Sequence, residues 1–151
     1  MRYLALMCVL TLGLNVIGCS QFQAMQPPQL QVQAMKIAQQ TEEGARIEIT
    51  LLLQNPNDKA LPLTYTDYRV EVPGVGVFAF GDETNRTLPA GGTQTVVLPA
   101  ALATRGRELH GIPCVVSGSV SYDPPGQLRK ILTESGVPLP SVNFTSTGPL
   151  P

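Results

Sequence analysis

Apolar and polar residues alternate along much of the chain from residue 30 onward. The clearest case is residues 47–54, where apolar side chains at every second position run up to an Asn-Pro-Asn triplet. A period of two places one set of side chains in a core and the other in solvent, as a half-buried β-strand requires. Leu30, Val32 and Ala34 alternate in the same way and are expected to face the core. We predict further strands over residues 64–72, 75–80, 93–98, 115–122 and 142–146.

Glycine and proline residues separate these predicted strands. Turn signals stand at Pro73-Gly74, Gly81-Asp82, residues 89–92 and residues 123–126. About seven short strands cut by such turns predict an all-β fold, a single Ig/fibronectin-III-like β-sandwich with Greek-key connections. The chain has no Trp, so it lacks the Cys…Trp…Cys pattern of antibody domains, and the fibronectin-III-like form is favoured. Residues 101–110 and 128–135 break the alternation, and each is expected to form one or two helical turns at an end of the sandwich.

The first 18 residues have the features of a secretory signal peptide. A basic start at Arg2 is followed by an apolar run over residues 3–14, which is too short to span a bilayer as a helix of the mature protein. The four residues that end at Cys19 read Val-Ile-Gly-Cys and resemble the bacterial lipobox, in which the cysteine is acylated and becomes the first residue of the mature protein. The sequence therefore predicts a lipoprotein with acyl chains such as palmitate on Cys19.

This interpretation divides the chain into a signal peptide (1–18), a polar, proline-bearing tether (19–29) and one β-sandwich domain (30–148). Several acyl chains together hold a protein stably on a membrane. Ser20, rather than an aspartate, follows the cysteine, which resembles the outer-membrane sorting pattern of enterobacteria. We expect the protein in the bacterial cell envelope, anchored through Cys19 in the outer membrane and facing the periplasm.

The charge balance argues against nucleic acid as a partner. The chain has 10 Lys and Arg residues against 11 Asp and Glu residues, and its formal net charge is −1. Its basic residues do not gather into a patch along the sequence, whereas nucleic acids and anionic surfaces both favour clustered positive charge. We therefore expect no nucleic-acid partner.

The three cysteines do not form a disulfide framework. Cys8 leaves with the signal peptide and Cys19 carries lipid, so Cys114 remains alone in the mature domain. Its neighbours Val115 and Val116 indicate a buried, inert thiol rather than a reactive one. Stability must then come from packing of the core.

Two groups of polar residues were candidates for chemistry, and we assign neither to a site. His110 precedes Cys114 by four residues, but a glycine and a proline between them exclude the helical spacing of a Cys–His pair. Asp82, Glu83 and Asn85 supply too few oxygen ligands for calcium, which takes six or more, and Thr84 and Arg86 interrupt the series. We interpret residues 82–85 as a solvated hairpin tip. The sequence thus predicts no catalytic residue, no metal and no cofactor.

The most hydrophobic predicted strand ends at Asn55-Pro56-Asn57. Asn side chains bond to nearby backbone groups, and Pro fixes φ and lacks a donor, so the triplet forces a tight, self-bonded turn. We select Asn55, Pro56 and Asn57 as a structural motif.

The triplet also opens an ordered series of short motifs. It is followed by Ala-Leu-Pro-Leu at 60–63, Tyr-Arg-Val-Glu-Val at 68–72, Leu-Pro-Ala-Gly-Gly at 88–92, Gly-Ser-Val-Ser-Tyr at 118–122 and Val-Asn-Phe at 142–144. In this order the motifs resemble the late embryogenesis abundant type 2 family, whose unit is the WHy (water stress and hypersensitive response) domain. The resemblance covers most of the mature chain.

This resemblance implies a compact β-sandwich and a role in protection during desiccation or other stress, and it carries over no catalytic residue. We therefore expect a non-enzymatic, lipid-anchored envelope protein that protects or binds partly unfolded client proteins. The alternative is an accessory, docking subunit of an envelope protein complex, since exposed strand edges can pair with a partner.

Overall fold

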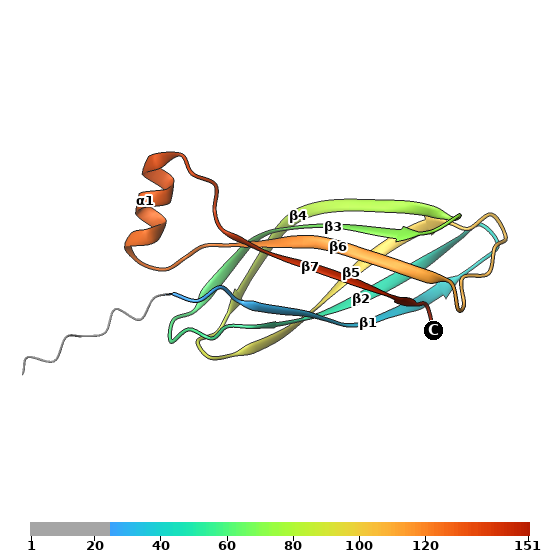
Figure 1. Cartoon of the computed structure of the whole chain (residues 1–151), viewed down its shortest axis with the longest axis horizontal. Coiled ribbons are helices and arrows are strands. Elements are labelled where there is room, and N and C mark those ends of the chain that lie inside the picture. Colours follow the sequence, from blue (N-terminus) through green and yellow to red (C-terminus); the bar gives the residue numbers. More distant parts are fainter. Residues whose placement is uncertain (1–24) are drawn as a thin grey trace, which may run out of the picture.

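Seven strands and one helix make up residues 25–151, the part of the chain that the structure, a computed structural model, describes (Figure 1). The strands are β1 (Gln29–Gln40), β2 (Gly44–Gln54), β3 (Leu61–Val72), β4 (Gly76–Leu88), β5 (Thr93–Ala103), β6 (Pro113–Tyr122) and β7 (Ser141–Pro149), and helix α1 (Gln127–Ser135) lies between β6 and β7. The predicted signal peptide, Cys19 and the first part of the tether lie outside the described residues.

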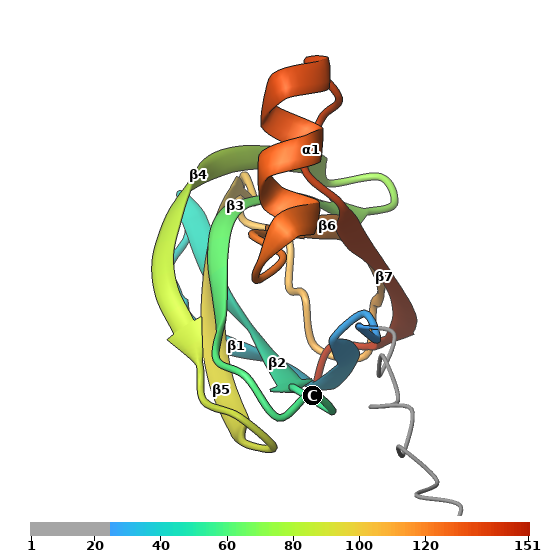
Figure 2. The same ribbon diagram turned by 90° about the vertical axis from the view of Figure 1, so that its left-hand side faces the viewer.

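The strands form two antiparallel sheets that pack face to face. One sheet has the order β1-β2-β5 and the other β4-β3-β6-β7, which is the Greek-key arrangement of a fibronectin-III-like sandwich. At the two sides of the sandwich, β1 lies beside β7 and β4 lies beside β5. Figure 2 views the molecule from one end and shows the sheets facing each other. The predicted all-β sandwich is confirmed.

The core lies between the sheets and is built from alternate residues of the strands. The alternation predicted for β2 is confirmed, because Ile47, Ile49, Leu51 and Leu53 are all buried. Tyr68 crosses this core from β3, and its hydroxyl donates a hydrogen bond to the carbonyl of Pro99 in β5. The bond satisfies a polar group within the core, and burial raises the pKa of Tyr68.

Strand β1 departs from the predicted phase at Ala34. Its pairing with β2 shifts register between Val32 and Ala34, which marks a β-bulge. Val32 pairs with Leu51, and beyond the bulge Met35 pairs with Ile49, so Met35 packs against the core while Ala34 is exposed. The inward prediction for Ala34 is wrong, because simple alternation cannot place the extra residue of a bulge.

The turn predicted at Gly81-Asp82 is wrong, since both residues lie inside β4. Gly81 sits under the ring of Tyr65 on the neighbouring strand, and a Cβ built at Gly81 would collide with the Tyr65 hydroxyl. The glycine therefore serves a close approach within the sheet and not a change of direction. The hairpin tip predicted over residues 82–85 is likewise part of the strand, where Asn85 has a φ of 43° beside a register shift against β3.

Two helical segments were expected. The helix predicted over residues 128–135 is confirmed as part of α1, and the prediction of helical turns over residues 101–110 is wrong. Strand β5 continues to Ala103 because its residues keep alternating between core and solvent. The turn that follows holds Arg105 and Gly106 at positive φ, which an α-helix of L-residues does not adopt.

Candidate functional site

The chain joins the sandwich at the end where three connections meet. We call this the tether end, and it consists of residues 25–28, the β2–β3 loop (55–60), the β4–β5 turn (89–92) and residues 123–140, which include α1. Antiparallel pairing brings these segments together, because β2, β4 and β6 finish where β1, β3, β5 and β7 begin. The tether end is on the left in Figure 1 and faces the viewer in Figure 2. The opposite, far end carries residues 41–43, 73–75 and 104–112.

Asn55 is the buried centre of the tether end. It has no exposed surface, and its Nδ2 donates hydrogen bonds to the carbonyls of Lys59 (2.8 Å), Pro89 (3.1 Å) and, more weakly, Leu88 (3.4 Å). Its Oδ1 accepts a bond from the backbone N–H of Asn57 (3.1 Å). One side chain therefore joins the β2–β3 loop to the end of β4, and its burial is stable because its polar atoms are paired.

Asn57 connects the same loop to the N-terminal segment. Its Oδ1 accepts a hydrogen bond from the Gln26 N–H, and its Nδ2 donates to the Gln26 carbonyl, both at 2.8 Å. The Nδ2 also donates to Asn55 Oδ1 at 2.9 Å. Pro56, between the two asparagines, is exposed. The neutral side-chain amides of the motif form hydrogen bonds mainly with backbone groups, so the motif positions chain segments. The contact between Asn57 and Gln26 could not be predicted from the sequence, because only the fold brings these residues together.

Helix α1 projects from the tether end (Figures 1 and 2). None of its residues is buried, and Leu128 and Ile131 are 44% and 55% exposed. Arg129 Nη1 lies 3.1 Å from Asp123 Oδ2, which ties the helix to the end of β6. Sequence reasoning found this helix but missed its exposed apolar side, for which the three-residue spacing of Leu128 and Ile131 was the available signal.

The helices among residues 25–151 include none with the length and apolar character needed to cross a bilayer.

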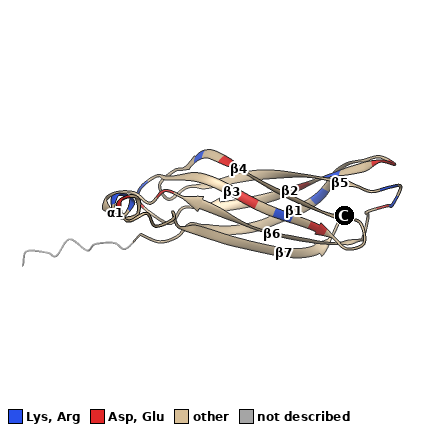
Figure 3. Ribbon diagram, turned by 90° about the horizontal axis from the view of Figure 1, so that it is seen from above, with Lys and Arg blue, Asp and Glu red and all other residues tan. Residues whose placement is uncertain are grey.

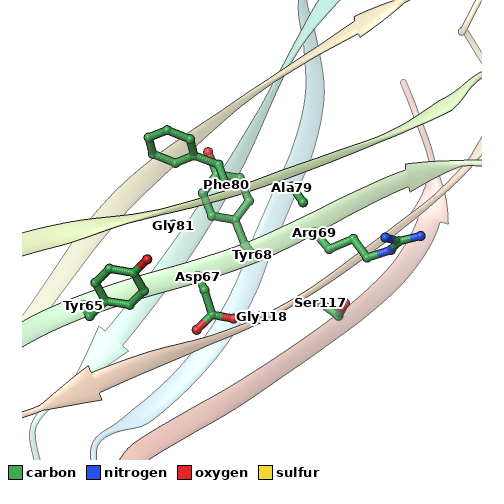
Figure 4. A pocket seen from close by; sticks show the side chains of 9 residues that line it. All are labelled: Tyr65, Asp67, Tyr68, Arg69, Ala79, Phe80, Gly81, Ser117 and Gly118. Carbon is green, nitrogen blue, oxygen red and sulfur yellow. The ribbon is translucent and has the colours of Figure 1, made fainter.

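A shallow hollow of about 470 Å³ lies over β3, β4 and β6 (Figure 4). Tyr65 and Asp67 of β3 and Phe80 of β4 are among the residues that line it. Asp67 Oδ1 accepts a hydrogen bond from Ser119 Oγ at 2.6 Å, and the Tyr65 and Phe80 side chains are exposed. The Phe80 ring packs with Tyr68 and Phe78, on the other face of the sheet from Asp67. A carboxylate already paired with a hydroxyl beside the exposed Tyr65 ring suits contact with another surface more than it suits proton transfer.

His110 and Cys114, the candidate Cys–His pair, differ in their exposure to solvent. His110 is exposed at the far end, whereas Cys114 is fully buried in β6. Burial raises the pKa of the Cys114 thiol, which keeps it protonated and unreactive, as predicted. Within the described part of the chain, no three His, Cys, Asp or Glu side chains group closely enough to hold a metal ion.

Acidic and basic residues are interspersed along the strands and loops of the sandwich (Figure 3). On the β1–β2 pair, the carboxylate of Glu48 forms ion pairs with Arg46 and with Lys36 Nζ, the latter at 3.1 Å. Hydrogen bonds from Arg46 and then Lys36 lower the pKa of Glu48. These pairs lie at the surface, where each contributes little to stability.

Comparison with known proteins gives a family and a fold. A sequence model of the late embryogenesis abundant protein family (LEA_2) matches residues 50–141. No curated protein sequence matches the chain. A solution structure of a candidate late embryogenesis abundant protein, At2g46140.1, is 14% identical, with a TM-score of 0.59 over 87% of this chain and 76% of that one.

Two other solved structures are similar. The X-ray structure of a structural-genomics target, SoR45, is 14% identical, with a TM-score of 0.57 over 84% of this chain and 89% of that one. The solution structure of AT1g01470 from Arabidopsis thaliana is 13% identical, with a TM-score of 0.53 over 89% of each chain. At such identities the likeness is one of fold.

Proposed function

Because the chain belongs to the late embryogenesis abundant protein family, we propose that it is a stress-related, non-enzymatic lipoprotein of the bacterial cell envelope, and that its sandwich is a WHy domain. The family match over residues 50–141 supports the stress-related role, and the Val-Ile-Gly-Cys sequence that ends at Cys19 supports the lipid anchor. An acylated Cys19 anchors the protein in the outer membrane, and the sandwich protects neighbouring proteins or membrane during desiccation.

The contacts of Gln26 support a short connection to the membrane. Asn57 holds both backbone groups of Gln26, and Cys19 lies seven residues earlier in the chain. Seven residues span at most about 25 Å when fully extended. The acyl chains therefore keep the tether end of the sandwich close to the bilayer.

The hollow over β3, β4 and β6 supports a binding role. Tyr65 exposes aromatic surface there, next to the paired Asp67 and Ser119 side chains. Exposed apolar surface beside polar groups is typical of protein interaction sites. A rigid sandwich offers this surface to partly unfolded clients without a change in its own fold.

The protective role is tested by desiccation survival of a strain that lacks the gene. We expect survival to fall at least tenfold, to return with the wild-type gene or a Gln21→Ala control, and to stay low with Cys19→Ala. A deletion strain that dries and recovers like its parent would contradict the stress role.

The same hollow also favours the alternative, an accessory subunit of an envelope complex. Affinity purification of the acylated protein from gently solubilised envelopes separates the two. A companion at fixed ratio, lost in a Tyr65→Ser variant and retained in Val97→Ser, would establish the accessory subunit. Recovery of the protein without a companion favours the stand-alone protective role.

A further inference from the structure

We propose that α1 and the segment after it rest on the membrane surface, so that the protein meets its bilayer at two points, the acyl anchor and an apolar helix face. This inference builds on the lipid anchoring of Cys19 proposed above. The occupant of the helix face is the lipid surface itself.

The first observation is that α1 turns its apolar side away from the sandwich. A surface helix of a globular domain normally buries its apolar stripe and exposes its polar side. In α1 the polar Arg129 is bound to Asp123 at the sandwich, while Leu128 and Ile131, one turn apart on the same side, are exposed. A nine-residue helix is too short to be stable in water without packing, so this side requires a partner surface.

The residues that follow α1 add further exposed apolar side chains at the tether end. Gly136 ends the helix in the left-handed conformation, and the N–H of Val137 donates to the Leu132 carbonyl at 3.0 Å. This Schellman-type ending returns the chain toward the last helical turn. Val137 and Leu139 are both exposed, so half of the eight large apolar side chains exposed in the described structure lie within residues 128–139.

The tether identifies the partner surface as lipid. Gln26 is fixed at the tether end, where α1 also lies, and Cys19 can be no more than about 25 Å from it. A bilayer that holds the acyl chains must therefore pass close to this end of the molecule. Residues 123–140 carry Arg129 and Lys130 against Asp123 and Glu134, with which they form ion pairs, so this segment has no net negative charge that would repel anionic headgroups.

The test measures lipid contact in the full-length acylated protein, reconstituted in vesicles of phosphatidylethanolamine and phosphatidylglycerol. A thiol-reactive fluorophore is placed through Ser135→Cys, which lies on the Leu128–Ile131 side, or through His110→Cys at the far end. Cys114 is buried and so stays unlabelled, which also reports that the sandwich is folded. We expect a doxyl-lipid quencher to reduce fluorescence at position 135 at least twofold more than at position 110.

A second variant assigns the contact to the apolar residues. Leu128→Ser with Ile131→Ser should abolish the extra quenching at position 135, whereas Val97→Ser, an exposed apolar residue of β5, should leave it unchanged. Vesicle-bound protein with equal quenching at both positions would overturn the helix contact and leave the anchor standing. Shielding from aqueous iodide without lipid quenching would show that protein covers the helix, again overturning the inference. Failure of the acylated protein to float with vesicles would refute the anchor, and the inference with it.

Discussion

The Asn55 side chain donates hydrogen bonds to three carbonyl groups and accepts two from Asn57, all at the tether end. Asn55→Ala would remove these bonds from the buried centre of the tether end, and the variant should lose about 2 kcal/mol of unfolding free energy. Denaturant unfolding measures the change. Asn143→Ala, at an exposed site on β7, is the matched control and should stay within about 0.5 kcal/mol of wild type. Equal stability of the two variants would show that the Asn55 bonds do not stabilise the fold.

Cys114 is the second informative single residue. Its thiol is buried and its pKa is raised, so a thiol reagent should modify the folded protein roughly a hundredfold more slowly than the denatured protein. Mass spectrometry of the modified chain follows the rate. Rapid, complete modification under native conditions would contradict the packing of β6.

At the scale of secondary-structure elements, β6 meets its neighbours at Gly118. A Cβ at this position would collide with the Asp67 carbonyl of β3 and lie 2.6 Å from the Phe144 ring of β7. Gly118→Ala should therefore cost about 1–3 kcal/mol through overpacking. Gly148→Ala is the control, since its Cβ would meet only the Met35 methyl group at an ordinary 3.5 Å. Thermal unfolding that ranks Gly148→Ala as the worse variant would contradict the described pairing of β6.

The β1–β2 pair should respond to pH through Glu48. Its folded-state pKa is lowered from an ordinary value of 4.5, so its contribution is complete above that value and is lost as the pH falls below it. The difference in unfolding free energy between wild type and Glu48→Gln should thus be small near neutral pH and should disappear as the pH falls below 4.5. It should also decrease in high salt. Denaturant unfolding over this pH range measures the difference. A difference that widens on acidification would contradict the ion pairs with Arg46 and Lys36.

At the scale of the whole molecule, sequence patterns were sufficient for the architecture and insufficient for the exceptions. The strict alternation of β2 predicted its buried residues because one face of this strand packs against the opposite sheet and the other face does not. The turn prediction failed at Gly81 because, in the sequence, a glycine that makes room for the Tyr65 side chain cannot be distinguished from a glycine that forms a turn. The inward prediction failed at Ala34 because the bulge in β1 is set by the pairing with β2, which a local pattern does not contain.

The candidate site was predictable only in part for the same reason. The Asn55-Pro56-Asn57 turn can be recognised from residue types, but its bonds to Gln26 and Pro89 join positions more than 30 residues apart. The position of α1 beside the tether depends on the order of strands in both sheets. The spacing of Leu128 and Ile131 predicts an apolar side on α1, but whether another element covers that side is decided only by the fold.

Lipid anchoring through Cys19 is tested by intact-mass and peptide mass spectrometry of the protein purified from its own envelope. We expect a mature chain that begins at Cys19 and carries acyl chains there, and a Cys19→Ala variant that is neither acylated nor retained in the outer membrane. A mature protein that keeps residues 1–18, or that begins elsewhere without lipid, would contradict the lipoprotein assignment on which the proposed function depends.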